Sequence, residues 1–340
     1  MESAKNGLTG GEAFHLYLQA RREWNLRTPS SIQKAMRYLD RAISLSGSFP
    51  LACAALADCY SILLDYGVLS PKEGLTQARL AAGRALHRGP NLAESLTSAA
   101  LVRQMDLDWP TAEVEFKEAI QTHPGYALAR QRYGLFLGWM GRWEESRREL
   151  DAAQALDPHS PAIAASPAWV DYYQGLSRDA IQTAQGVLDR HPGFSSAQAV
   201  QSLALVQSGR TAEAAKGLDD ARSGEEENVS LLSLAAYARG RNGDVEVAEA
   251  HLETLRDWAE TRYVSPYYVA VSLLGLGRET EALEALEGAE EERSPQLVYL
   301  ATEPIFDPLR GKPEFQALLE RLRLPEGRWE GMGVAKEVVA

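Results

Sequence analysis

The stretch AEVEFKEAIQTHP, residues 112–124, carries the pattern that decides the fold of this chain. A small, a large and a small apolar residue stand at Ala112, Phe116 and Ala119, and Pro124 closes the stretch. Spacings of four and three residues place these side chains on one face of a helix. Because proline cannot continue a helix, the sequence predicts an amphipathic helix that ends just before Pro124.

The same pattern returns every 34 residues along the chain. Its first position stays small, its other two positions stay apolar, and glycine recurs at the same interval between the predicted helices. Glycine suits a helix end or tight turn that requires a positive φ. A fixed period of this length is the signature of a repeat protein. The recurring helix positions are Ser146, Leu150, Ala153; Ala180, Ala184, Val187; Ala214, Leu218, Ala221; Ala248, Leu252, Leu255; and Ala282, Leu286, Ala289, and the glycines are Gly141, Gly175, Gly209, Gly243 and Gly277.

These marks resemble the tetratricopeptide repeat, a helix–turn–helix unit of about 34 residues with small side chains where its two helices meet. The resemblance implies an all-α, right-handed α-solenoid of about eight units with a C-terminal capping helix. Residues 1–9 are expected to be a linker, residues 294–325 the cap and residues 326–340 a flexible tail. The expected units are 10–48, 49–91, 92–125, 126–159, 160–193, 194–227, 228–261 and 262–293.

Some stretches also resemble the C-terminal repeat region of bacterial multidomain signalling proteins. They include AFHLYLQARREWNLRTPSSIQKAMRYLDRAISL near the start, DYGVLSPKEGLTQA, and EERSPQLVYLATEPIFDPLRGKPEFQALLERLRLP near the end. In that group the repeats usually follow a winged-helix DNA-binding domain, a serine/threonine kinase or a nucleotide cyclase. The resemblance covers residues 8–325 and implies either a stand-alone relative or a fragment of such a protein.

Composition narrows the function classes. The chain has 340 residues and a net charge of -12, and residues 151–340 hold 17 basic and 31 acidic residues. Because such a surface repels phosphate backbones, we expect no direct nucleic-acid binding. The sequence has no long apolar run and no signal peptide, which predicts a cytoplasmic protein without membrane insertion. Cys53 and Cys59 fit buried free thiols in a reducing compartment.

The sequence holds no motif that indicates catalysis. It lacks the phosphate-binding GxxxxGK[ST] loop, GxSxG, HExxH and paired CxxC motifs. His123 and His191 share a repeat position, but they stand two units apart, beyond the span of one metal ion. The acidic runs at residues 225–227 and 290–292 are expected on solvated faces. We therefore expect no enzyme, no catalytic or metal-ligating residue and no cofactor.

The candidate binding site is the concave face of the solenoid. In the tetratricopeptide family, the first helix of each unit lines this face, and here the central units would place an aromatic strip on it. Tryptophan and tyrosine are favoured anchors for an apolar peptide or partner helix. The resemblance therefore implies a non-catalytic protein–protein interaction scaffold or sensor module of a bacterial signalling system. The expected partner-binding residues are Leu135, Trp139, Trp169, Tyr172, Tyr173, Leu203, Tyr237 and Tyr267.

Two alternatives remain open at this point. Tight winding of the solenoid could bury the aromatic rings against neighbouring helices. A small molecule could instead fill the groove and control an attached or partner effector. A closed pocket would favour the small molecule, and an open trough across several units would favour a peptide. The sequence leaves the partner, the input signal and the oligomeric state open.

Prolines set two further expectations. Pro167 falls inside an expected helix, where it removes a hydrogen bond, so we expect a short or kinked helix that starts near Pro167. SPQLVYLA, residues 294–301, predicts a ninth first-position helix that Pro304 ends. A helix over residues 313–322 should then cover the end of the array, with Phe306 and Leu309 as plugs.

Overall fold

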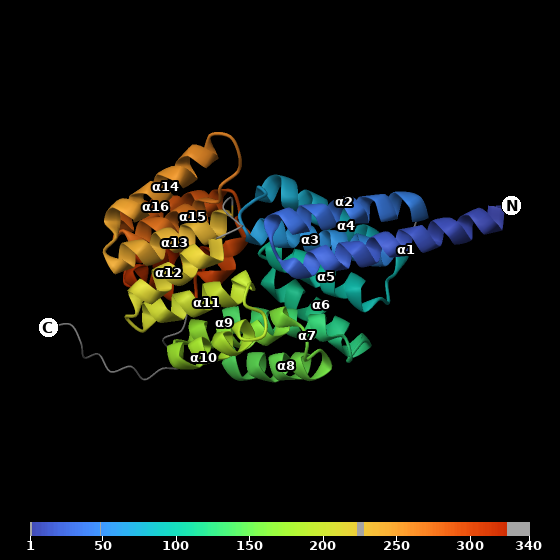
Figure 1. Ribbon diagram of the computed structural model, residues 1–340, viewed down its shortest axis with the longest axis horizontal. Coiled ribbons are helices and arrows are strands. Elements are labelled where there is room, and N and C mark those ends of the chain that lie inside the picture. The colour runs from blue at the N-terminus through green and yellow to red at the C-terminus, as the bar shows by residue number, and fades with distance from the viewer. Residues whose placement is uncertain (1, 48, 223–227, 325–340) are drawn as a thin grey trace.

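The computed structural model describes residues 2–47, 49–222 and 228–324. Every regular element in these ranges is an α-helix or a short 3-10 helix, and the described residues form no strand (Figure 1). The prediction of an all-α chain is therefore confirmed. The predicted flexible tail at residues 326–340 lies outside the described residues.

Consecutive helices pack against each other as pairs, an inner A helix followed by an outer B helix. The A helices are α1 (Glu2–Leu26), α3 (Pro50–Asp65), α5 (Ala93–Met105), α7 (Ala127–Trp139), α9 (Pro161–Gln174), α11 (Ser195–Gln207), α13 (Val229–Asn242) and α15 (Pro266–Gly275). The B helices are α2 (Pro29–Ser46), α4 (Pro71–Arg88), α6 (Trp109–Thr122), α8 (Trp143–Leu156), α10 (Ser177–Leu188), α12 (Thr211–Arg222), α14 (Val245–Ala259) and α16 (Glu279–Glu291).

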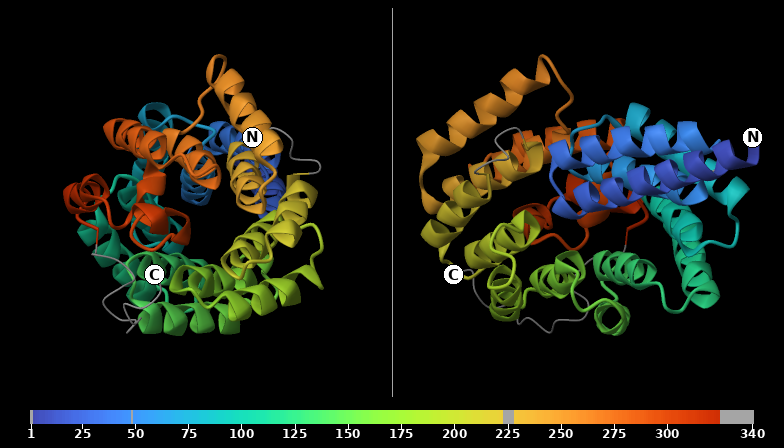
Figure 2. Two further views of the ribbon diagram at one scale, coloured as in Figure 1. Left: turned by 90° about the vertical axis from the view of Figure 1, so that its left-hand side faces the viewer. Right: turned by 45° about the vertical axis from the view of Figure 1, so that its right-hand side comes forward.

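The pairs follow one another in a right-handed solenoid that curls round a common interior (Figure 2). Each A helix contacts the A helices before and after it, as α7 does with α5 and α9. Residues 2–9, the expected linker, are helical and belong to α1. Whether they join the repeats to a preceding domain stays a prediction.

The repeat pattern explains which helix lies inside. In α8 the buried side chains are Ser146, Leu150 and Ala153, which are the three positions picked out by the 34-residue period. Such a narrow stripe lets a B helix cover its partner on one side and face solvent on the other. By contrast, α3 buries almost every residue from Ala52 to Leu64. A helix that is apolar on most sides must be covered on most sides, which places the A helices in the interior.

The periodic glycines close the A helices. Gly141, Gly175, Gly209, Gly243 and Gly277 all have φ between 72° and 87°. Residues with a Cβ atom rarely adopt this left-handed backbone conformation. Glycine therefore occupies the sharp turn that leads into the B helix. The prediction of a positive φ at these positions is confirmed.

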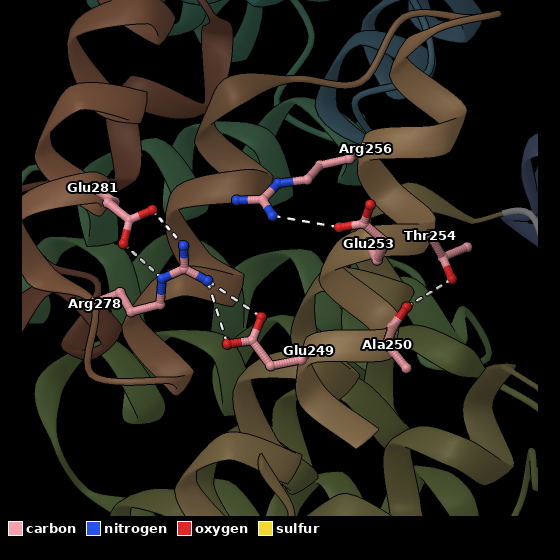
Figure 3. A network of polar contacts seen from close by, with 7 residues as sticks. All are labelled: Glu249, Ala250, Glu253, Thr254, Arg256, Arg278 and Glu281. Atoms are coloured by element: carbon pink, nitrogen blue, oxygen red, sulfur yellow. Dashed lines mark hydrogen bonds and ion pairs between the residues drawn. The ribbon is translucent and has the colours of Figure 1, made fainter. Parts of the chain in front are cut away.

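In some units, an arginine directly follows the turn glycine. Its side chain joins the outer surfaces of two neighbouring helix pairs. Arg278 donates to Glu281 at the start of its own B helix and, at 3.2 Å, to Glu249 on the preceding B helix (Figure 3). Arg142 bonds Glu145 and Glu113 in the same manner. These pairs are partly exposed, so each adds at most about 1 kcal/mol and mainly orients adjacent pairs.

The expectation that this helix starts near Pro167 was wrong. Helix α9 begins at Pro161, where the Ser160 side chain accepts from the Ile163 amide, and it runs through Pro167 to Gln174. Side chains brace the turn before the proline. Ser166 donates to the carbonyl of Ala162 at 2.8 Å, and Gln131 of α7 donates to the same carbonyl at 2.9 Å. Proline leaves the carbonyl of Ile163 without its helical donor, and these bonds hold the adjacent carbonyl of Ala162 in the turn before it.

The expected ninth A helix was also wrong. The segment forms two short 3-10 helices instead, η1 (Pro295–Tyr299) and η2 (Pro304–Leu309). A side chain bonds the carbonyls that flank the two turns: Arg310 donates to the carbonyl of Leu300, just after η1, and to that of Glu303, just before η2, at 3.3 and 3.1 Å. The backbone can therefore leave the helical path without losing hydrogen bonds.

The capping helix is present as predicted. Helix α17 (Pro313–Arg321) packs on α16, and Arg321 pairs with Glu290 of that helix. Phe306 and Leu309 are fully buried beneath it. An unforeseen contact lies further away, where the indole of Trp109 on α6 donates to the carbonyl of Leu322 at 3.0 Å. The cap thus touches both the last pair and the third one.

Candidate functional site

The eight expected partner-binding residues lie together on the inner side of the solenoid. They come from the A helices α7, α9, α11, α13 and α15 and form or contact one apolar cluster. Five of them are at most 7% exposed, and the other three are half-buried. The buried ones are Trp139, Tyr172, Tyr173, Leu203 and Tyr267, and the half-buried ones are Leu135, Trp169 and Tyr237.

The chain's own C-terminal segment covers these rings. Tyr299 of η1 lies among Trp139, Tyr173 and Tyr267, with ring centroids 5.1, 6.4 and 6.2 Å away. Phe306 of η2 packs 5.4 Å from Tyr267. The aromatic strip exists where the repeat phase predicted it, and η1 and η2 occupy much of it. Its role in binding a partner stays a prediction.

This inserted segment also ties the end of the solenoid to its beginning. The Tyr299 hydroxyl donates to the carboxylate of Asp65, at the end of α3. Tyr268 and Gln296 donate to the Asp65 carbonyl at 2.6 and 2.9 Å. Gly67, with φ +68°, leaves room for this closure, because a Cβ there would stand 2.7 Å from the Tyr268 ring. The second and last helix pairs are therefore in direct contact.

A second buried carboxylate stands where η2 begins. Glu303 is 4% exposed, and it accepts hydrogen bonds from the Tyr172 hydroxyl and, at 3.3 Å, from the Ile305 amide. Burial raises its pKa to about 7, although the Tyr172 bond opposes this change. Burial likewise raises the pKa of Asp65, against the bond from Tyr299. Both acids therefore gain a proton more readily than an exposed carboxylate would.

A cavity of about 220 Å³ remains between the A helices and the inserted segment. Six of the eight predicted residues line it, all except Tyr172 and Tyr237. Its charged lining residues are Arg27, Asp65, Arg132 and Glu303. They belong to the first, second and fourth pairs and to η2, so a molecule inside would touch both ends of the solenoid.

The cavity is lined by both apolar and polar side chains. Its polar groups are hydroxyls, amides and the four charged side chains. No group of three or more histidines, cysteines, aspartates or glutamates in the described ranges could hold a metal ion. No described helix is long and apolar enough to cross a membrane. The expectations of no cofactor and no metal stay predictions.

Sequence reasoning missed the charged lining residues and the segment that fills the groove. Arg132 precedes the predicted groove residue Leu135 by one helical turn, and an arginine within the apolar stretch ALARQRYGLFLGW was the available signal. Arg27 lies just past the end of α1, in a connection for which the repeat pattern predicts no contact. Tyr299 was assigned to a ninth helix, so its position inside the groove could not be foreseen.

Comparisons with known proteins agree on the fold. A scan against protein-family models finds no match. The transcriptional regulator HilA of Salmonella typhimurium is 26% identical over 176 residues, which are 52% of this chain and 32% of HilA. The match thus spans about a third of that relative's length.

Two solved structures resemble most of the chain. A tetratricopeptide repeat protein from Parabacteroides merdae has a TM-score of 0.51 at 14% identity, covering 78% of this chain and 99% of that protein. Yeast Tom70 has a TM-score of 0.50 at 15% identity, covering 92% of this chain and 68% of Tom70. Together with the repeat period and the paired helices, these likenesses show that the chain has the tetratricopeptide repeat fold.

Proposed function

We propose that this chain is a non-catalytic interaction module of a bacterial regulatory system, acting in the cytoplasm through a protein or peptide partner. The likeness to HilA, a transcriptional regulator, supports the regulatory setting. The solenoid supports the mode of action, since stacked helix pairs offer a long concave surface for a partner. The acidic charge and the absence of catalytic motifs argue against nucleic-acid binding and catalysis by this chain.

The observation that carries the proposal is the aromatic strip with part of its surface uncovered. Trp169 of α9 and Tyr237 of α13 are only half-buried, and both are large side chains on A helices that flank α11. A partner peptide or helix would contact these two rings next to the segment that fills the rest of the groove. Partner binding at this place needs no unfolding of η1 or η2.

A pull-down with the immobilised chain tests this function. The double variant Trp169→Ala/Tyr237→Ala is compared with Leu156→Ala/Leu176→Ala, which alters two exposed apolar side chains that do not line the cavity. We expect proteins recovered by the wild type from a lysate of the source cells to be lost with the first variant alone. Equal recovery by both variants, measured by mass spectrometry, would argue against a partner site on the strip.

One observation favours a second function, in which the chain senses a small molecule. The cavity of about 220 Å³ lies between the A helices and η1–η2, so its walls come from both ends of the solenoid. A ligand there would change the strength of the closing contacts and thereby the shape presented to an effector. Small-angle X-ray scattering with and without ligand would test this, since an unchanged radius of gyration in a saturated sample contradicts it.

A further inference from the structure

The four charged side chains that line the cavity are not equally well paired. The two acids each have a hydrogen-bond donor within the protein: Asp65 accepts from Tyr299, and Glu303 accepts from Tyr172 and the Ile305 amide. Burial raises the pKa of Asp65, although the attraction of Arg27 and Arg132 opposes this larger effect. The donors that reach the two acids are nevertheless tyrosine hydroxyls and a backbone amide, not the guanidinium groups of these arginines.

Arg27 is buried, and one of its guanidinium donors has no hydrogen-bond acceptor in the described part of the chain. The residue is 8% exposed, and its Nε has no hydrogen-bond acceptor among the described residues. One face of the guanidinium lies on the Trp24 ring, 3.5 Å from the ring centroid. This contact covers the face of the group but uses none of its N–H donors, which point along the edges of the plane.

Arg132 of α7 is half-buried and also has donors without an acceptor among the described residues. Its Nε and Nη2 are both buried, and neither has an acceptor in the described part of the chain. Its positive charge lowers the pKa of Arg27, in addition to the larger effect of burial, so the two cations disfavour each other. Asp58 of α3 is attracted by both arginines, yet it lies within ion-pair distance of neither.

Two guanidinium groups that line one cavity and have buried donors without acceptors in the described ranges form an unfavourable arrangement unless an anion joins them. An unpaired buried charge is costly, and arginine donors match carboxylate and phosphate oxygens in a planar, two-bond geometry. The remaining wall combines hydroxyl and amide groups with apolar side chains, among them Met105, Leu135 and Trp139.

We propose that the cavity binds a small organic anion. Arg27 and Arg132 hold its carboxylate or phosphate group, and Leu135, Trp139 and Met105 cover its apolar part. A volume of about 220 Å³ is below the usual range for drug-sized ligands and selects a molecule of roughly one ring. This inference rests on the small-molecule function above and gives that function the chemical class of its ligand.

The experiment uses the full chain and three probes of similar shape: benzoate, phenyl phosphate and the neutral benzamide. Isothermal titration calorimetry measures the Kd of each. We expect at least one anion to bind about tenfold or more tightly than benzamide, since a charge-assisted hydrogen bond contributes about one to two powers of ten in affinity. The two anions distinguish a carboxylate site from a phosphate site.

Variants assign the binding to the arginines. We expect Arg132→Gln to weaken binding of the anions about tenfold and leave benzamide unchanged, whereas Arg132→Lys keeps part of the affinity. Arg148→Gln is the matched control, because this exposed arginine lies on the neighbouring helix α8 away from the cavity. Without any ligand, Arg132→Gln should raise the thermal midpoint, because it removes an unpaired buried charge.

The outcomes separate the two proposals. If benzamide binds as tightly as the anions, the anion inference is wrong while a ligand cavity remains. If none of the three probes binds to the wild type, the anion inference is wrong and the small-molecule function loses its site. A lower thermal midpoint for unliganded Arg132→Gln would overturn the inference independently, because it would mean that the arginine already has a stabilising partner.

Discussion

The buried carboxylate of Glu303 makes the stability of this fold depend on pH. Its pKa is raised from the ordinary value of 4.5 to about 7, mainly by burial. As pH rises, the unfolded chain loses this proton first, so stability is fully present below about pH 4.5 and is lost as pH passes through about 7. The predicted sign is therefore a loss of stability towards alkaline pH.

The size of this loss follows from the two pKa values. Between pH 5 and pH 8, a shift from 4.5 to about 7 lowers the free energy of unfolding by about 2.5 kcal/mol. Solvent screening hardly reduces this effect of the pKa change on stability, because Glu303 is only 4% exposed. The variant Glu303→Gln keeps an acceptor for the Tyr172 hydroxyl but cannot ionise, so it lacks this contribution.

Urea denaturation followed by circular dichroism at pH 5, 6, 7 and 8 measures the effect. We expect the wild type to lose about 2.5 kcal/mol relative to Glu303→Gln across this range. Glu314→Gln is the control, since this glutamate is exposed on α17 and its loss changes the net charge equally. Parallel pH profiles for the wild type and Glu303→Gln would refute the reasoning.

Three further predictions concern the contacts that close the solenoid. Phe306→Ala should lower the free energy of unfolding by about 3–5 kcal/mol, because the ring is fully buried between α15 and the cap. Gly67→Ala should be destabilising by about 1–3 kcal/mol more than Gly47→Ala, since both glycines have positive φ but only Gly67 faces a ring, that of Tyr268. Equal losses for the two glycine variants, measured by urea denaturation, would mean that the closing contact adds nothing. Arg278→Ala should cost less than about 1 kcal/mol despite its several ion pairs, because they are partly exposed, and a larger shift in the urea midpoint would contradict that estimate.

Local pattern explains why the repeat units could be predicted. The small and large residues at Ser146, Leu150 and Ala153 act on helices that are close in sequence, and so does the turn glycine at Gly141. Such signals depend on the 3.6-residue period of the helix and on the φ that a turn requires. They can therefore be recognised in the sequence before the tertiary structure is known. They failed at Pro167, where a neighbouring helix supplies the bracing hydrogen bond from Gln131.

The sequence by itself determined the solenoid: its helix pairs, its period, its inner strip of aromatic residues and its need for a cap. Only the tertiary structure decided that the solenoid closes on itself and fills part of its own groove. The deciding contacts join residues far apart, as Tyr268 bonds Asp65 across 203 positions, and each occurs once. A repeat pattern records only contacts between neighbouring units, because those alone recur at every step. The pairing of Tyr299 with Asp65, and the donors of Arg27 and Arg132 that lack an acceptor among the described residues, could therefore emerge only once the chain had turned back on itself.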